Sequence, residues 1–239
     1  MTPIILHHGL FGAGSFRGID RAIAEAGHPV FVSMVHPTAG IEKRAKQLQQ
    51  WILSIAPRFS GSRAVLIAHS MGGLDARYML SHLGMAERIE ALVTISTPHR
   101  GSPYADWCAQ HLGRRLRGFE VVRRFGLDVD GVLDVTTDRC ARFNEKTHDV
   151  PGVRYFSVSV SCPWRELPAF GIPSWYIVQR ADGDNDGLVS VNSARWATHL
   201  TTWNTDHWRA INQHYGLAAM KAGDISPEYL ALIREISSG

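Results

Sequence analysis

The stretch from residue 64 to residue 80 reads AVLIAHSMGGLDARYML, and its pattern changes abruptly in the middle. An apolar run ends at His69 and Ser70, two glycines follow, and apolar residues then recur at helical spacing. A continuous apolar run is typical of a parallel strand that is covered on both faces. The stretch therefore predicts a buried strand, a tight turn that carries a serine, and a helix.

The same alternation continues along the chain. Ile41, Ala45, Leu48 and Ile52 recur at helical spacing and predict a helix over residues 40–56. Residues 226–236 predict a last helix, with Ser226 as its N-cap and a proline at its first position. The apolar runs that predict strands occupy residues 3–8, 30–35, 64–70, 91–97 and 153–160, and a further strand-like run occupies 199–205.

Strands that alternate with helices predict an α/β fold with a mostly parallel, doubly wound sheet. The 239 residues are enough for one large domain with its own core, and no fixed-period repeat divides them. Over residues 100–150 the periodicity weakens and arginines gather. We expect this segment to be an insertion over the edge of the sheet, within a single domain that covers residues 1–239.

The composition excludes several classes of protein. A net charge of +3 is too small and too scattered to indicate a nucleic-acid partner. No apolar run is long enough for a transmembrane segment, and no signal-peptide pattern begins the chain. We therefore expect a cytoplasmic protein, or a secreted one if a signal has been removed. The three cysteines allow at most one disulfide and have no metal-like spacing.

Ser70 stands where an open parallel sheet places its ligands, at the carboxyl end of a strand. A serine on such a turn is the nucleophile elbow of many hydrolases, which has the pattern G-x-S-x-G. The positions two before and two after the serine must be small, and here they are Ala68 and Gly72. The pattern predicts that Ser70 is a nucleophile, although a serine that only caps the following helix fits it too.

The helix after the turn presents its first amides to negative charge, so the amide of Met71 is one candidate donor to an oxyanion. The second donor is expected in the loop after an early strand. Residues 7–16 form such a loop and contain three glycines, and we select the amide of Leu10. The alternative is that these glycines only shape a turn.

With these residues identified, the chain resembles the bacterial triacylglycerol lipases and carboxylesterases of the α/β-hydrolase superfamily. The similar segments occur in the family's order and cover most of the chain, except for the middle at about 107–130. They are residues 7–12, 68–78, 92–106, 131–145, 185–196 and 206–217.

The resemblance implies a catalytic triad of Ser70, Asp186 and His207, in the family's order along the chain. By residue type alone, other acids and histidines compete for these roles: Asp182, Asp184 and Asp206 for the acid, and His199 and His214 for the base. We expect His8, His69 and His99 to have structural hydrogen-bonding roles.

The implied activity is that of a serine hydrolase that cleaves carboxylic esters of lipids through an acyl-enzyme and needs no organic cofactor. The alternatives are a short-chain carboxylesterase, an acyl thioesterase and, in a different class, a non-catalytic binding protein. Residues 114–124 are rich in arginine and apolar residues. They fit a lid helix that touches a lipid surface and, equally, an ordinary solvated helix.

The resemblance also indicates whether this protein should bind a calcium ion. Many of these lipases hold a calcium ion, with an aspartate ligand two positions after the catalytic histidine. Arg209 occupies that position here, and a guanidinium has no oxygen with which to bind a cation. Gln213 matches another ligand position but makes a poor site alone. We therefore expect no metal, with Arg209 paired to a nearby carboxylate.

Overall fold

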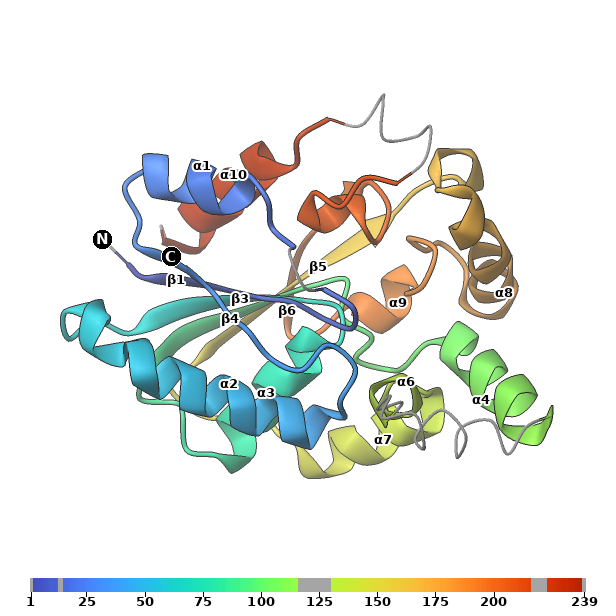
Figure 1. Ribbon diagram of the computed structural model, residues 1–239, viewed down its shortest axis with the longest axis horizontal. Coiled ribbons are helices and arrows are strands. Elements are labelled where there is room, and N and C mark those ends of the chain that lie inside the picture. The colour runs from blue at the N-terminus through green and yellow to red at the C-terminus, as the bar shows by residue number, and fades with distance from the viewer. Residues whose placement is uncertain (1, 13–14, 116–129, 216–222, 238–239) are drawn as a thin grey trace.

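The computed structural model describes residues 2–12, 15–115, 130–215 and 223–237. Within them, six strands form one sheet in the order β2-β1-β3-β4-β5-β6, and all neighbouring strands are parallel (Figure 1). The predicted parallel, doubly wound sheet is confirmed. The strands are β1 (Ile4–His7), β2 (Val30–Val32), β3 (Ala64–His69), β4 (Ile89–Ile95), β5 (Arg154–Ser161) and β6 (Thr198–Asn204).

Helices cover both faces of the sheet. In Figure 1, α1 and α10 lie on one face, and α2 and α3 lie on the other. The α-helices are α1 (Ile19–Glu25), α2 (Ile41–Ile55), α3 (Gly72–His82), α4 (Pro103–Arg115), α6 (Asp130–Asp134), α7 (Thr137–Lys146), α8 (Ile172–Asp182), α9 (Val191–Ala194) and α10 (Ser226–Ser237). The described residues also form the short 3-10 helices η1 (Ala56–Phe59), η2 (Trp164–Glu166), η3 (Ala169–Gly171) and η4 (Arg209–Ile211).

The sheet separates two apolar cores. Successive residues of a strand point to opposite faces, so Ile4 and Leu6 pack against α1 and α10 while Ile5 packs on the side of α2 and α3. The strands β1 and β3 are thus buried at every position and are almost entirely apolar, whereas β5 and the partly exposed edge strand β6 carry many polar residues. The covered sheet gives a rigid base for the loops at its carboxyl ends.

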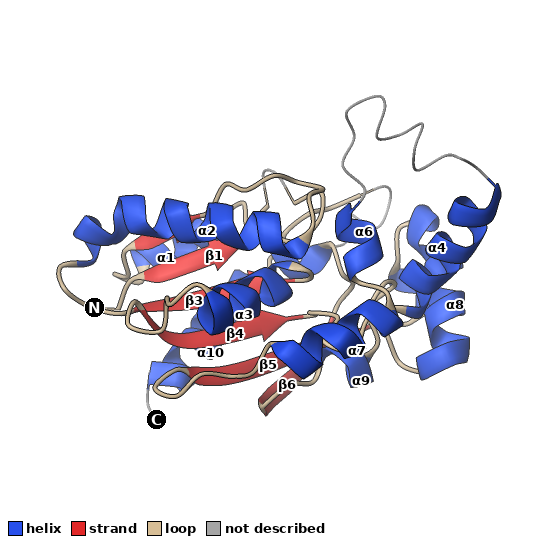
Figure 2. Cartoon of the chain, turned by 90° about the horizontal axis from the view of Figure 1, so that it is seen from below, coloured by secondary structure: helices blue, strands red, loops and turns tan. Residues whose placement is uncertain are grey.

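Several helices lie beyond the carboxyl ends of the strands. Figure 2 shows α4, α6 and α8 at this end of the sheet, and α4 packs against α8. The segment 100–150 contributes α4, α6 and α7, while 116–129, which holds most of the arginine-rich stretch, lies outside the described residues. In the part of the chain that the structure describes, no helix is long and apolar enough to cross a bilayer.

The start of the last helix differs from the sequence prediction. Ser226 is the first residue of α10 itself, and its hydroxyl donates to Oδ1 of Asp224 at 2.7 Å. The same carboxylate oxygen accepts from the Ser226 amide at 3.0 Å. The prediction of Ser226 as N-cap is wrong, because its hydroxyl donates to the carboxylate of Asp224, whereas an N-cap side chain accepts from an amide of the first turn.

Candidate active site

The turn between β3 and α3 places Ser70 at the carboxyl edge of the sheet. Ser70 directly follows β3, its φ is 55°, and α3 begins two residues later at Gly72. Residues other than glycine seldom adopt a positive φ, so the serine lies on a strained turn from strand to helix. Its amide donates to the Ile95 carbonyl at 2.9 Å, which ties the turn to β4.

Two glycines allow the first loop of the chain to approach this turn. A Cβ atom on Gly9 would lie 2.6 Å from the Cβ atom of Ser70. A Cβ atom on Gly72 would lie 2.8 Å from the carbonyl oxygen of His8. Any side chain at either position would therefore push the first loop away from the serine.

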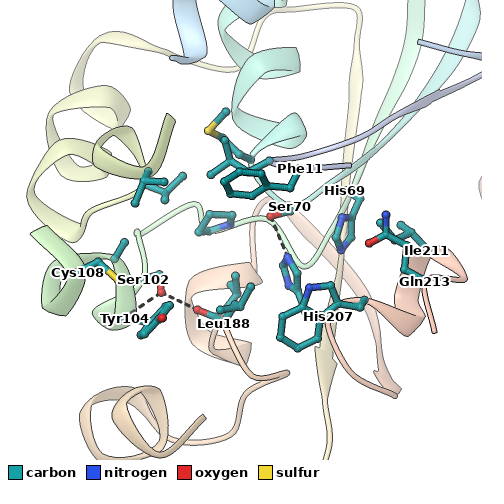
Figure 3. Close-up of a pocket in the computed structure, with 18 of the residues that line it drawn as sticks. Phe11, His69, Ser70, Ser102, Tyr104, Cys108, Leu188, His207, Ile211 and Gln213 are labelled. Atoms are coloured by element: carbon teal, nitrogen blue, oxygen red, sulfur yellow. Dashed lines mark hydrogen bonds between the residues drawn. The ribbon is translucent and has the colours of Figure 1, made fainter. Parts of the chain in front are cut away.

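Three side chains from distant parts of the sequence meet beside the turn. The Oγ atom of Ser70 lies 3.0 Å from Nε2 of His207, a contact drawn in Figure 3. Nδ1 of His207 lies 2.6 Å from Oδ2 of Asp186. Asp186 is fully buried, and His207 is 6% exposed. A continuous chain of hydrogen bonds thus leads from a buried carboxylate, through an imidazole, to a half-buried hydroxyl.

Asp186 is held by several donors. Its Oδ1 accepts hydrogen bonds from the amides of Leu188 and Val189, at 2.9 and 2.8 Å. Its Oδ2 accepts from His207 and also from the hydroxyl of Ser96, directly after β4. Ser96 is not among the predicted residues, because a hydroxyl side chain after a strand is common and carries no specific signal.

The competing acids have other partners. Asp184 is exposed, and the carboxylate of Asp182 accepts a hydrogen bond from a serine hydroxyl. Asp206 is buried, and its Oδ2 accepts from Nε of Arg209 at 2.6 Å. The structure therefore pairs the imidazole with the acid at position 186, and not with its neighbours in either loop.

The other histidines lie in structural positions or face solvent. His99 is fully buried, its Nε2 lies 3.0 Å from a threonine hydroxyl of β4, and burial lowers its pKa well below the ordinary value. Burial lowers the pKa of His69 in the same direction and lowers that of His8 to about 4. These side chains are therefore neutral near pH 7. Among the described residues neither ring nitrogen of His69 has a hydrogen-bond partner, so the predicted hydrogen-bonding role of His69 is wrong. The remaining candidates are His199, 3.4 Å from the hydroxyl of Ser159, and His214, which is exposed.

The two predicted oxyanion donors both line the cavity that contains Ser70. Among the described residues, no protein atom accepts a hydrogen bond from the amide of Leu10 or of Met71. The loop that carries Leu10 is fixed by Arg44, a fully buried residue of α2 that the sequence does not reveal as part of the site. Arg44 donates from Nη2 to the carbonyl of His8 at 2.6 Å.

A cavity of about 210 Å³ opens beside Ser70, with His207 in its wall (Figure 3). The cavity is mostly apolar, and it lies between the sheet and the helices at its carboxyl end. Its apolar wall includes Leu10, Ala105, Val132, Val135, Leu188 and Trp208. The site thus offers a nucleophilic hydroxyl next to an apolar space, which suits a substrate with a hydrocarbon portion.

Sequence comparisons connect these features with known proteins. Residues 41–124 match the family model of the PGAP1-like alpha/beta domain. Triacylglycerol lipase 2 of Saccharomyces cerevisiae is 34% identical over 202 residues, which cover 82% of this chain and 61% of that lipase. A triacylglycerol lipase of Pseudomonas fragi is 38% identical over 137 residues, 55% of this chain and 43% of that lipase. The chain therefore spans less than two thirds of the length of these relatives.

Solved structures share the fold over nearly the whole chain. A metagenomic carboxyl esterase superposes with a TM-score of 0.83 and 21% identity, over 99% of this chain and 76% of that one. The mature form of a Bacillus licheniformis lipase superposes with a TM-score of 0.71 and 24% identity, over 97% of this chain and 91% of that one. The chain therefore has the α/β-hydrolase fold of these proteins, and in sequence it is related to triacylglycerol lipases.

Proposed function

We propose that this protein is a serine ester hydrolase that cleaves carboxylic esters of lipids, acylglycerols or other medium- and long-chain esters, through an acyl-enzyme. The observation that carries the proposal is the chain of contacts from Asp186 through His207 to Ser70, at the wall of an apolar cavity. The similarity to triacylglycerol lipases supports the choice of a lipid ester.

The first half of the reaction transfers the acyl group to the enzyme. Nε2 of His207 takes the proton of the Ser70 hydroxyl while Oγ attacks the ester carbonyl. The tetrahedral intermediate then collapses, the bond to the leaving oxygen breaks, and Nε2 returns the proton to the alcohol. Asp186 stays ionised throughout, fixes the tautomer of the imidazole and stabilises its protonated form.

The second half repeats these steps with water. His207 takes a proton from the water molecule as it attacks the acyl-enzyme, and then returns that proton to Oγ of Ser70 as the carboxylic acid leaves. In both halves the amides of Leu10 and Met71 donate to the oxyanion, a contribution of roughly 3–4 kcal/mol for one donor in a known hydrolase.

Two other enzymatic activities use the same chemistry, and one experiment separates them. A short-chain carboxylesterase or an acyl thioesterase would use the same three residues, whereas a non-catalytic binding protein would turn over no ester. We expect rates on a series of p-nitrophenyl esters, from acetate to palmitate, to be highest for medium or long chains. A preference for acetate supports the carboxylesterase, a preference for acyl thioesters supports the thioesterase, and no turnover rejects hydrolysis.

The mouth of the cavity suggests contact with a lipid surface during catalysis. Four aromatic side chains near it are well exposed: Phe11 (67%), Phe170 (58%), Tyr215 (43%) and Trp107 (41%). Phe11 and Tyr215 line the cavity itself, and the ring of Phe170 lies 5.5 Å from that of Tyr215. We propose that this aromatic rim contacts the lipid. We also propose that residues 1–239 form a single domain, and that its segment at about 100–150 acts as a lid.

Activity on a long-chain ester is expected to jump once the ester exceeds its solubility and forms droplets, because the rim then gains an apolar phase to contact. Phe170→Ala should bind phosphatidylcholine vesicles roughly tenfold more weakly, since an aromatic ring is lost from the contact. Leu53→Ala on α2, where Leu53 is 48% exposed, is the matched control and should bind as the wild type does. A smooth saturation curve through the solubility limit would contradict the lipid-surface proposal.

We further propose that hydrolysis is independent of calcium. Nε of Arg209 lies 2.6 Å from Oδ2 of Asp206, and its Nη2 lies 3.4 Å from Oε2 of Glu166. The guanidinium thus joins the loop of His207 to η2 and leaves no acceptor for a cation at this position. Gln213, at the other position that the family uses, donates from Nε2 to the Ser15 hydroxyl at 3.0 Å.

Dialysis against a chelator is therefore expected to leave both activity and melting temperature unchanged, whether or not calcium is added back. Arg209→Ala should lower the melting temperature by roughly 3–10 °C, because the carboxylates of Asp206 and Glu166 lose the guanidinium that joins them. The matched control is Arg142→Ala, whose ion pair with Asp138 is exposed and should contribute little. A loss of activity on chelation that calcium restores would overturn the proposal.

A further inference from the structure

Ser96 combines three features that a merely structural residue at the end of a strand does not need. It directly follows β4, its side chain is fully buried, and its φ is 47°. A side chain other than glycine in this left-handed region costs roughly 1–2 kcal/mol for each residue. Strained residues of this kind persist where the surroundings hold them, and they gather at functional sites.

The backbone around Ser96 is fixed on both sides. Its own amide donates to the carbonyl of Val158 on β5 at 2.9 Å. The carbonyl of the preceding residue, Ile95, accepts from the Ser70 amide at 2.9 Å. The end of β4 therefore lies between the turn of the nucleophile and the loop of the acid, and the position of the Ser96 side chain is set by three adjacent strands.

The hydroxyl of Ser96 contacts the acid and the base together. It donates to Oδ2 of Asp186, the same oxygen that lies 2.6 Å from Nδ1 of His207. Its Oγ atom also lies 3.3 Å from that nitrogen. With the two amides on Oδ1, the buried carboxylate has four donors. Because Oδ2 otherwise has the imidazole alone, removal of the hydroxyl leaves this oxygen with one donor fewer and less firmly oriented toward Nδ1.

We infer that Ser96 is a positioning residue that holds Oδ2 of Asp186 in line with Nδ1 of His207. The inference rests on the proposed function of Ser70, Asp186 and His207. Ser96 does not line the cavity, so it acts on the chemical step and not on substrate binding. In line with Nδ1, the carboxylate stabilises the protonated imidazole, and loss of the alignment would weaken that stabilisation.

The test compares two variants that both lack the hydroxyl. Ser96→Ala keeps the strained backbone position, whereas Ser96→Gly relieves it, so the glycine variant should melt at the higher temperature of the two. Both should lose about 10- to 100-fold in kcat with little change in KM, the effect of one charge-assisted hydrogen bond. In both, the acidic limb of the pH profile of kcat/KM should move to lower pH, because a carboxylate out of line with Nδ1 stabilises the protonated imidazole less.

The matched control is Thr94→Val, which removes a buried hydroxyl two residues before Ser96, on β4, where it contacts His99. It should keep the wild-type pH profile. A Ser96→Gly variant with wild-type kcat, or with an acidic limb that stays in place or moves to higher pH, would overturn the inference. Wild type and Ser70→Ala, measured alongside, keep the two proposals apart: if ester hydrolysis does not depend on Ser70, the proposed function itself fails.

Discussion

Ser70→Ala is expected to lower kcat for ester hydrolysis by roughly a million-fold, the loss seen when the nucleophile of a serine hydrolase is removed. The variant should fold and melt as the wild type does, because it deletes one half-buried oxygen whose partner in the protein is the imidazole of His207. Alanine also lacks the hydroxyl that attacks the ester, so no acyl-enzyme can form. Initial rates on a p-nitrophenyl ester and a thermal melt measure the two expectations.

The control for this prediction is Ser174→Ala. Ser174 is also buried and also donates its hydroxyl, here to the carbonyl of Gly171 at 2.9 Å, but it lies on α8 and not in the cavity. Its loss should leave the rate within a factor of about two. Activity of Ser70→Ala close to that of the wild type would show that another group is the nucleophile.

Asp186→Asn is expected to lower kcat by roughly 10⁴-fold, as in the corresponding variant of a serine protease. The amide that replaces Oδ2 can donate to Nδ1 of His207, which places the imidazole proton on Nε2. The imidazole then has no lone pair toward the Ser70 hydroxyl and cannot take its proton. KM should change little, because the buried carboxylate does not line the cavity.

Two neighbouring acids give the matched controls. Asp184→Asn changes an exposed side chain, and Asp182→Asn changes a carboxylate whose partner is a serine hydroxyl. Both variants should keep nearly the wild-type kcat. If Asp184→Asn proved to be the inactive variant, the acid would have been assigned two residues too late in the chain.

The strands were predictable because of where they lie. The central strands β1, β3 and β4 are covered on both faces, so most of their residues are apolar and their runs stand out in the sequence. The edge strand β6 is partly exposed and mostly polar, and its run is weaker. The helices α1 and α8 were not predicted. α1 is seven residues long and buries only Ile19 and Ile23, and α8 buries only Ser174 and Val178. Such short or weakly buried helices leave little periodic signal.

The site residues differ in how far their roles can be inferred from the sequence immediately around them. The turn that carries Ser70 is made by a short stretch with a strict demand for small residues, so the sequence alone predicts it. Asp186 and His207 lie on separate loops that meet only in the folded chain, and the family resemblance was needed to choose them. Ser96 and Arg44 act through contacts with distant residues, and nothing in their local sequence distinguishes them.

The partners of Arg209 show the same limit. The sequence indicates that a guanidinium replaces an oxygen ligand, but the identity of its carboxylates depends on the fold. Asp206 is three residues away along the chain, whereas Glu166 comes from η2, which follows β5. A contact between residues far apart in the chain, such as that of Arg209 with Glu166, cannot be inferred from one sequence without its tertiary structure.

The central claim is that Ser70 is the activated nucleophile, and covalent labelling tests it most directly. The protein is treated with a fluorophosphonate, digested and analysed by mass spectrometry, with Ser70→Ala and Asp186→Asn alongside. The account predicts one adduct, on the peptide that contains Ser70, with no adduct in Ser70→Ala and much slower labelling in Asp186→Asn. An adduct on another serine of the wild type, or equal labelling of Ser70→Ala, would contradict it.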